Sequence, residues 1–348
     1  MALISSNALT FGIRAFLSSV ITGALLCSFT CRVSSPQHLS RDNTHVGIVF
    51  NVGGKDDNSY NAAAWEGAKR AQSEFHAMLL HDIEPGTPAS VEPSIRAFAE
   101  RDCNLIIGIG LIHKEVIERV AREYPYLHFV VVDSVVEESN VSSLVFSEQD
   151  GSYLVGIIAA RKSRTDVIGF IGGMDIQLIH RFELGFAEGA HATNSNMKLL
   201  VNYIGVTDSA WNDPAKCREI ALSQIDRGAD VIFVAAGNSG LGAFDAVEVR
   251  AGTFVIGVDS NQNWIKPGHV LTSMVKRVDN AVYQIIRDEV QGRFLGGVHV
   301  FDLSNDGIAY AVDRYNVDLL EPSVISEVES AKRKIVAKEI IVSDPMKR

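Results

Sequence analysis

The sequence predicts an α/β fold of two doubly wound lobes, each built on a parallel sheet and joined to the other by a multi-strand hinge. Short runs rich in Val, Ile and Phe alternate with longer helical patterns along most of the chain. The short runs are continuously apolar, as strands covered by helices on both faces are. About eleven such runs exceed one comfortable sheet, which favours two sheets.

Each expected element follows from its local pattern. The expected strands span residues 45–50, 77–82, 104–109, 127–132, 143–146, 166–171, 198–204, 231–235, 254–258, 270–275 and 298–302. Helical patterns cover residues 61–75, 92–101, 113–123, 149–162, 178–192, 213–227, 240–250, 277–292 and 321–337. Strands that alternate with helices in this way favour parallel pairing through helical crossovers.

The lobes are expected to share the chain unevenly. We expect the N-terminal lobe to contain residues 45–150 and about 259–297. The C-terminal lobe then contains residues 151–258 and about 298–343. A chain that crosses several times between two lobes forms a hinge and a cleft, and clefts at domain boundaries are favoured ligand sites.

Composition narrows the class of protein. The chain has 348 residues and 47% of them are apolar, enough for two ordinary domains with full cores. With 32 basic and 42 acidic side chains, the net charge is −10. An acidic balance argues against a nucleic-acid-binding surface, which needs a basic patch. We therefore expect no nucleic-acid partner.

The N-terminal part of the chain indicates export. Residues 12–31 form a long apolar, nearly uncharged stretch, and residues 32–44 are polar without periodicity. This pattern predicts a cleaved export signal over residues 1–31 and a tether over 32–44; an uncleaved membrane anchor is the alternative. Cys31, or alternatively Cys27, stands where a lipoprotein carries its lipid. We expect an exported, lipid-anchored protein of the cell envelope.

A dense polar cluster follows the first expected strand. Asp57, Tyr60 and Asn61 lie in the turn between the apolar run 46–50 and a helical pattern. Helix capping explains an Asp or Ser in such a turn but not an aromatic ring. Turns after the carboxyl ends of parallel strands hold ligands in open α/β sheets. The cluster predicts capture of a small polar molecule with a flat face.

Two aspartates end apolar strands in different halves of the chain. Asp133 closes VVVD and Asp259 closes VIGVD. Each can be a simple turn residue, but each also points toward the cleft of its lobe. Facing one ligand from opposite sides, they would accept hydrogen bonds from amines or vicinal hydroxyls. Hydrogen bonds to charged groups contribute roughly 1.5–3 kcal/mol each.

Three further positions have both a structural and a binding interpretation. Glycines 237, 240 and 242 do not match a dinucleotide or phosphate loop, so close backbone approach to a neutral ligand is expected at Ala236 and Gly237. Lys276 ends a strand and is either a surface charge or a cleft residue. Phe182 is either core or pocket, because Phe186 shares its helix face.

The sequence shows no catalytic or metal-binding constellation. It contains no nucleophile elbow, no HExxH and no CxxC motif, and its histidines are scattered. We therefore expect neither an enzyme nor a bound metal or cofactor.

The motifs occur in one order that resembles a known family. DDNSYN, VVVD, FELGFAEGA, VIFVAAGNSGLG, VIGVDSNQ, VLTSMVKRVDNAVY and KIVAKEII follow one another within residues 45–343. In this the chain resembles the basic membrane lipoprotein family of ABC-transporter substrate-binding proteins, which includes the purine nucleoside receptor of spirochaetes. The resemblance implies a type I periplasmic-binding fold, a purine nucleoside ligand, ABC permease and ATPase partners, and a monomer.

The resemblance also implies roles for single residues. The purine base would lie between the rings of Tyr60 and Phe182, with its edge bound by Asp133. Asp259 and Lys276 would hold the ribose. The remaining implied positions are Asn61, which matches the family's asparagine, and the loop at Ala236 and Gly237, which would line the pocket.

One residue departs from the family pattern and keeps other ligands open. Nucleoside-binding members usually carry an aspartate at the end of the first strand, where this chain has Asn51. The lost charge favours a different small polar ligand, such as a pentose. A surface adhesin or antigen with a vestigial cleft is a further alternative. A nucleoside hydrolase would need a metal-binding aspartate run, of which Asp56 and Asp57 are a weak version.

Overall fold

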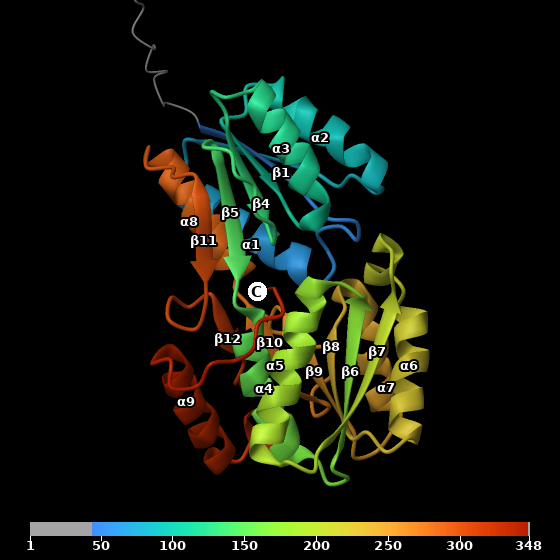
Figure 1. Cartoon of the computed structure of the whole chain (residues 1–348). Coiled ribbons are helices and arrows are strands. Elements are labelled where there is room, and N and C mark those ends of the chain that lie inside the picture. The colour runs from blue at the N-terminus through green and yellow to red at the C-terminus, as the bar shows by residue number, and fades with distance from the viewer. Residues whose placement is uncertain (1–43, 347–348) are drawn as a thin grey trace, which may run out of the picture. The chain divides into compact units, whose positions relative to one another are not determined.

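The structure is a computed structural model, and it describes residues 44–346. Within this range, twelve strands form two six-stranded sheets that are covered by helices (Figure 1). This arrangement confirms the predicted α/β fold with two parallel-sheet lobes. The predicted export signal and both candidate lipid-bearing cysteines, Cys31 and Cys27, lie outside the described residues.

The sheet of the first lobe is entirely parallel, in the order β11-β5-β4-β3-β1-β2. Its strands are β1 (Thr44–Val49), β2 (Met78–Ile83), β3 (Leu105–Gly108), β4 (His128–Val132), β5 (Val141–Phe146) and β11 (Gly297–Phe301). The side chains of β3 are buried at every position, and four of the five in β4 are buried. Burial on both faces explains why these runs are continuously apolar.

The sheet of the second lobe has the order β12-β10-β9-β8-β6-β7. Its strands are β6 (Val167–Met174), β7 (Lys198–Gly205), β8 (Val231–Ala235), β9 (Phe254–Asp259), β10 (Val270–Lys276) and β12 (Ile308–Tyr310). Only β12 pairs in the antiparallel direction. The sequence analysis missed β12, because three residues are too few to show a periodic pattern.

Helices pack on both sheets. The first lobe carries α1 (Tyr60–Glu74), α2 (Val91–Ala99), α3 (Lys114–Glu123) and α8 (Val278–Val290). The second carries α4 (Glu148–Lys162), α5 (Gln177–Thr193), α6 (Pro214–Asp226), α7 (Leu241–Glu248) and α9 (Pro322–Val336). Helices α4 and α5 can approach closely because Gly185 and Gly189 have no side chains. A side chain at either position would collide with a carbonyl oxygen of α4.

The chain crosses between the lobes three times, and the observed crossings correct the expected boundaries. The crossings follow β5, β10 and β11. Strand β10 pairs with β9 in the second lobe, whereas residues 259–297 were expected in the first. Strand β11 pairs with β5 in the first lobe, whereas residues 298–343 were expected in the second. An apolar strand looks the same in either sheet, so composition alone did not place these two.

The three crossings contact one another. The amide of Ser147 donates to the carbonyl oxygen of Phe301 at 2.9 Å, and the rings of Phe146 and Phe301 are stacked with centroids 5.2 Å apart. The ammonium of Lys276 lies 4.9 Å from the centre of the Phe146 ring. The crossings therefore form one hinge bundle, which we define as residues 146–148, 276–278 and 301–303.

None of the helices within residues 44–346 has the length and apolar character needed to cross a membrane. Cys103 and Cys217 are both buried with free thiols. Burial raises the pKa of the Cys103 thiol to about 11 and that of Cys217 to about 12, so both are protonated at neutral pH.

Candidate ligand-binding site

A cavity of about 240 Å³ lies between the two lobes, at the carboxyl ends of their strands. This volume is close to the lower end of the roughly 300–1,000 Å³ found for small-molecule sites. The predicted residues that line it are Asn51, Asp57, Tyr60, Asn61, Asp133, Phe182, Gly237, Asp259 and Lys276. The cleft thus brings together side chains that are more than 200 residues apart in the sequence.

Asp57 is mainly a structural residue, although it borders the cavity. Its carboxylate accepts hydrogen bonds from the amides of Ser59, Asn61 and Ala62 at 2.9–3.0 Å, and from the Asn61 side chain at 3.1 Å. These donors open helix α1, so the carboxylate caps the helix. Burial raises the pKa of Asp57, and the same hydrogen bonds oppose that shift.

The two asparagines of the first lobe fix the strand end beside the cavity. The side-chain oxygen of Asn61 accepts from the amide of Asn51 at 3.0 Å. The side-chain oxygen of Asn51 accepts from the amide of Val52 at 2.8 Å. Asn51 therefore borders the cavity with an uncharged amide whose oxygen already has a backbone partner.

The Tyr60 ring borders the cavity from the start of α1. Its hydroxyl oxygen is buried beside the carboxylate of Asp133 but has no hydrogen bond of good geometry to the described residues. Burial, followed by the negative charge of Asp133, raises the pKa of this phenol well above its ordinary value. A buried polar atom without a partner is costly, so the hydroxyl is available to a bound molecule.

Both strand-end aspartates have left-handed backbones. Asp133 has φ of 67° and Asp259 has φ of 63°. Non-glycine residues seldom adopt this region, and Asp and Asn tolerate it better than other side chains. The same backbone turn therefore ends β4 in one lobe and β9 in the other, which places both carboxylates at the cavity.

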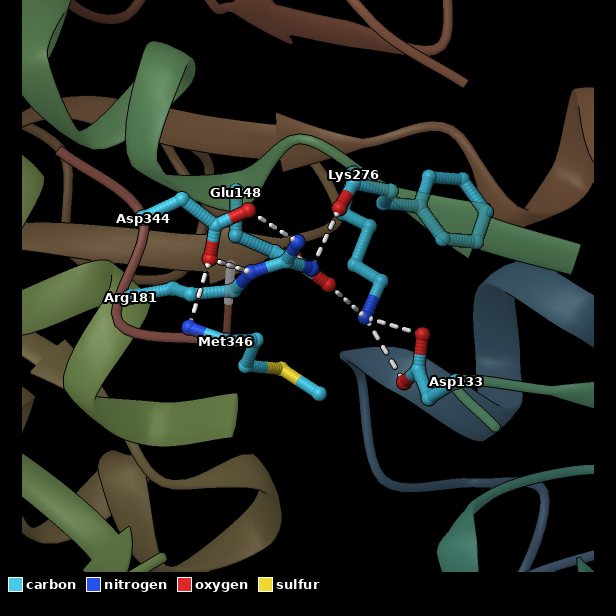
Figure 2. Close-up of polar contacts among 7 residues, drawn as sticks. Asp133, Glu148, Arg181, Lys276, Asp344 and Met346 are labelled. Atoms are coloured by element: carbon cyan, nitrogen blue, oxygen red, sulfur yellow. Dashed lines mark hydrogen bonds and ion pairs between the residues drawn. The ribbon is translucent and has the colours of Figure 1, made fainter. Parts of the chain in front are cut away.

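Lys276 lies at the centre of the charged part of the site (Figure 2). Its Nζ is 2.7 Å from Oδ1 of Asp133 and 2.9 Å from Oε1 of Glu148. The side chain is only 2% exposed. Burial alone would lower the pKa of Lys276, but the two carboxylates outweigh it and raise the pKa. The ammonium therefore stays charged across the physiological range.

Asp259 lies in a different electrostatic setting. Its Oδ2 accepts from the hydroxyl of Ser59 across the cleft at 2.7 Å. Burial raises the pKa of Asp259 to about 6, although the charge of Lys276 opposes the shift. Two further hydrogen bonds join the lobes here, from Ser260 Oγ to the Ser59 carbonyl at 2.7 Å and from Gln262 Nε2 to the Asn58 carbonyl at 3.0 Å. These contacts hold the lobes together around the cavity.

The second lobe contributes most of the apolar surface. The ring of Phe182 borders the cavity and packs in the core against Phe233, with centroids 6.4 Å apart. Phe182 is therefore both core and pocket, the two alternatives that the sequence left open. The ammonium of Lys276 lies 5.2 Å from the Tyr60 ring centre and 5.9 Å from that of Phe182. Both aromatic rings thus flank the same charged group.

Ala236 is a correction. It is fully buried in the core of the second lobe and does not line the cavity, whereas Ala235 and Gly237 do. Ala236 follows the last residue of β8, and its side chain packs in a buried apolar cluster of the second lobe. Gly237 has φ of 56°, which turns the chain toward the cavity.

The sequence analysis missed several lining residues. They are Val52, Gly53, Gly110, Leu111, Ile112, Met174, Ile176, Leu178, Ile179, Asp208, Trp211, Ala235, Asn238 and Val258. The most chemically distinctive is Trp211, in a short 3-10 helix (Asp208–Trp211) after β7. A side chain at Gly173 would collide with the Trp211 ring. A tryptophan in a polar loop after a strand was the signal that could have identified it.

The residues that the structure describes contain no group of three or more His, Cys, Asp or Glu side chains placed to hold a metal ion. The polar groups of the cavity are a lysine, carboxylates, amides and a phenol, and aromatic rings border it on both sides. Such a site can bind a small polar molecule with a flat face. The fold and the cavity together define a two-lobed solute-binding protein.

Comparison with known proteins is consistent with this class and gives the family. A family model described as "ABC transporter substrate-binding protein PnrA-like" matches residues 44–345. The chain belongs to this family. It is therefore a substrate-binding protein of the ABC-transporter type, and family membership confirms the expectation that it is not an enzyme.

Curated relatives align over most of their length. The chain is 35% identical to "CD4+ T-cell-stimulating antigen" of Listeria monocytogenes, covering 94% of this chain and 95% of the relative. It is 30% identical to "ABC transporter nucleoside-binding protein BmpA" of Lactococcus lactis, covering 85% and 88%. It is 31% identical to "Uncharacterized lipoprotein PF1695" of Pyrococcus furiosus, covering 86% and 77%.

Solved structures share the fold. An ABC transporter solute-binding protein from Aeropyrum pernix K1 superposes with a TM-score of 0.79 at 28% identity, covering 88% of this chain and 94% of that one. A solute-binding protein from Conexibacter woesei superposes with a TM-score of 0.70 at 24% identity, covering 87% and 99%. The second likeness concerns the fold alone.

Proposed function

We propose that the protein binds a purine nucleoside in the cavity between its lobes and delivers it to an ABC importer. One observation carries this proposal: two aromatic rings, one from each lobe, border a cavity that also contains Asp133, Asp259 and Lys276. Flat rings suit a base, and charged groups suit its polar edge and a sugar. The family supplies the permease and ATPase partners.

The base is proposed to lie between the rings of Tyr60 and Phe182. Base stacking on an aromatic ring contributes about 1–3 kcal/mol per base. Asp133 would accept hydrogen bonds from N–H groups on the purine edge: the exocyclic amine of adenine or guanine, and the ring N1–H of guanine or hypoxanthine. Binding would compete with its ion pair to Lys276, whose Nζ lies 2.7 Å from it in the structure described here.

The ribose is proposed to lie between Asp259, Lys276 and Asn51. An ionised Asp259 accepts from two vicinal hydroxyls, and the ammonium of Lys276 donates to a sugar oxygen. The relative from Lactococcus lactis, which carries "nucleoside-binding" in its name, supports this ligand class.

We further propose that the protein is exported and carried on a membrane by a lipid on Cys31, with Cys27 as the alternative. Relatives from Pyrococcus that are named lipoproteins support this location. Mass spectrometry of the mature protein, recovered from membranes, tests it. A lipid-modified N-terminal cysteine is expected; an unmodified terminus at another residue would contradict the anchor.

The ligand is tested with the chain from residue 32 onward, purified without added ligand. Native mass spectrometry shows any co-purified molecule, and calorimetry then compares adenosine, guanosine, inosine, cytidine and ribose. A purine nucleoside that binds at micromolar concentration or tighter is expected. If ribose binds and no nucleoside does, the ligand is a sugar.

Tyr60→Ala tests the stacking contact, with Tyr126→Ala as its matched control. Tyr126 is 73% exposed and lies outside the cavity. Loss of the Tyr60 ring should weaken purine binding about tenfold or more, while Tyr126→Ala should leave it unchanged. Full purine affinity in a Tyr60→Ala, Phe182→Ala double variant would contradict the sandwich.

A pentose is the second candidate, and Asn51 is the observation that favours it. The Asn51 amide brings no charge to the cavity, and its oxygen is already bonded to the amide of Val52. The panel of ligands above distinguishes the two candidates directly, because only the nucleosides carry a base for the aromatic rings.

A further inference from the structure

A continuous series of ion pairs runs from the cavity to the C-terminal segment, which we define as residues 337–346 after helix α9 (Figure 2). Lys276 joins Asp133 to Glu148, and Nη1 of Arg181 lies 2.9 Å from the second carboxylate oxygen of Glu148. Arg181 then holds Asp344 through two parallel contacts, Nε to Oδ1 at 2.8 Å and Nη2 to Oδ2 at 2.6 Å. Five alternating charges are therefore connected in series.

This series of ion pairs passes through the hinge bundle. Glu148 is the first residue of α4, directly after the first crossing, and Lys276 ends β10 at the second crossing. Arg181, on α5, also donates to the carbonyl oxygen of Phe146 at 2.8 Å. The ion pair of Lys276 with Glu148 therefore joins two crossings, and Arg181 fixes the end of β5 to the C-terminal segment.

The side chains in these ion pairs are buried, which makes their positions depend on one another. The exposed fractions of the side chains are 0% for Glu148, 2% for Lys276, 12% for Arg181 and 4% for Asp344. Buried charges are stable only while each keeps its partners and its geometry. A guanidinium held by two parallel contacts is also fixed in orientation. Displacement of one member therefore changes the position of the next.

Only one end of this series of ion pairs borders the cavity that is proposed to hold the ligand. Asp133 and Lys276 line the cavity, whereas Glu148, Arg181 and Asp344 do not. The ammonium of Lys276 is shared between the two carboxylate oxygens of Asp133, each 2.7 Å from Nζ, and the carboxylate of Glu148 at 2.9 Å. The negative charge of Asp344 balances Arg181 so that Glu148 can still hold the ammonium.

We propose that Asp344 is a positioning residue for the ligand site: through Arg181 and Glu148 it fixes the ammonium of Lys276 in the cleft, and the C-terminal segment thereby sets ligand affinity from outside the cavity. The proposal rests on the proposed function, because Lys276 is itself a proposed ligand contact.

The first test needs no ligand. In an NMR spectrum, the buried ammonium of Lys276 is identified by its loss in Lys276→Gln, and the exchange rate of its protons with water is measured. Asp344→Asn should raise this rate several-fold, and Asp344→Glu should restore a slow rate. Glu339→Gln is the matched control, because Glu339 is an exposed acid of the same segment and should leave the rate unchanged.

The second test measures adenosine affinity by calorimetry in the same variants. Asp344→Asn should weaken binding about three- to tenfold, Asp344→Glu should recover most of the loss, and Glu339→Gln should match the unaltered protein. Unchanged proton exchange in Asp344→Asn would overturn the proposal, as would faster exchange with unchanged affinity.

The two tests separate the two proposals. If the unaltered protein binds no nucleoside and Asp344→Asn still accelerates exchange at Lys276, the nucleoside assignment fails and the positioning of Lys276 by Asp344 holds. If nucleosides bind and Asp344→Asn changes neither quantity, the positioning role fails and the nucleoside assignment is unaffected.

Discussion

Asp133 and Asp259 occupy equivalent places in the two lobes but differ in their surroundings. Each follows an apolar strand, each has a left-handed backbone, and each carboxylate borders the cavity. Asp133 is paired with a full positive charge, the ammonium of Lys276 at 2.7 Å. Asp259 accepts from the neutral hydroxyl of Ser59, and its burial raises its pKa to about 6.

The difference shows that one backbone device can present two kinds of acceptor. The strand end fixes where the carboxylate lies, and the surrounding groups decide which partner it bonds. Asp133 is an acceptor whose cationic partner, Lys276, must be displaced or shared on binding. Asp259 is an acceptor whose charge depends on pH near neutrality. Four changes test this contrast.

The largest effect is expected from removal of the cation that distinguishes the two sites. Lys276→Met leaves the carboxylates of Asp133 and Glu148 buried without it, which should lower the free energy of unfolding by about 3–5 kcal/mol. Urea denaturation at pH 7 measures this. Lys266→Met is the control, since Lys266 pairs with Asp245 and Glu248 at the surface and should lose less than about 1 kcal/mol. Equal losses would mean that burial of the Lys276 pair is unimportant.

The two aspartates can next be neutralised separately. Asp133→Asn and Asp259→Asn keep the shape and tolerate the left-handed backbone. Each should weaken adenosine binding by about 1.5–3 kcal/mol, the contribution of a hydrogen bond to a charged group. Calorimetry with purine and pyrimidine nucleosides then separates their roles. Asp133→Asn should penalise purines most, whereas Asp259→Asn should penalise all ribonucleosides equally; the reverse pattern would exchange the two assignments.

The pH dependence should belong to Asp259. Its folded pKa of about 6 lies above the roughly 3.9 of an unfolded aspartate, so the folded state binds more protons and loses stability as the pH rises between these values. Ligand binding runs the opposite way, because sugar hydroxyls need the ionised form. Adenosine affinity should fall about tenfold between pH 7 and pH 5. In Asp259→Asn this dependence should disappear; if it persists, another group titrates.

The smallest effect is expected at Asn51. Asn51→Asp adds a charged acceptor beside the proposed ribose and should strengthen adenosine binding by about 1 kcal/mol, the difference between charged and neutral hydrogen bonds. Calorimetry at pH 8, where Asp259 is also ionised, measures the change. Weaker nucleoside binding together with stronger binding of a free pentose would indicate that the native ligand is the sugar.

Much of the fold could be predicted because buried strands and amphipathic helices leave clear patterns. The exceptions have physical causes. Strand β12 has only three residues, and the patterns of β10 and β11 do not show which of the two sheets each strand joins. The positions of the crossings depend on which neighbours each strand pairs with. Strand pairing is a tertiary contact, so no local sequence pattern predicts it.

The site followed the same division. Tyr60, Asp133, Asp259 and Lys276 could be identified because each stands where a strand ends or a helix begins, and the cavity contains all four. The partners of Lys276 in the ion pairs, Glu148 and the Arg181 beyond it, could not be identified from the sequence. Glu148 opens a helix and Arg181 lies within one, positions where charges are ordinarily solvated. Their burial depends on contacts with residues far along the chain.

The hinge bundle also closes one side of the space between the lobes. Its three segments are bonded to one another, so the lobes can rotate about the bundle but cannot part there without loss of those bonds. The cavity is also bordered by residues outside the bundle, among them exposed Gly53 and half-buried Asn238. We expect the solute to enter and leave beside these residues, and a permease that receives it to approach from the same side.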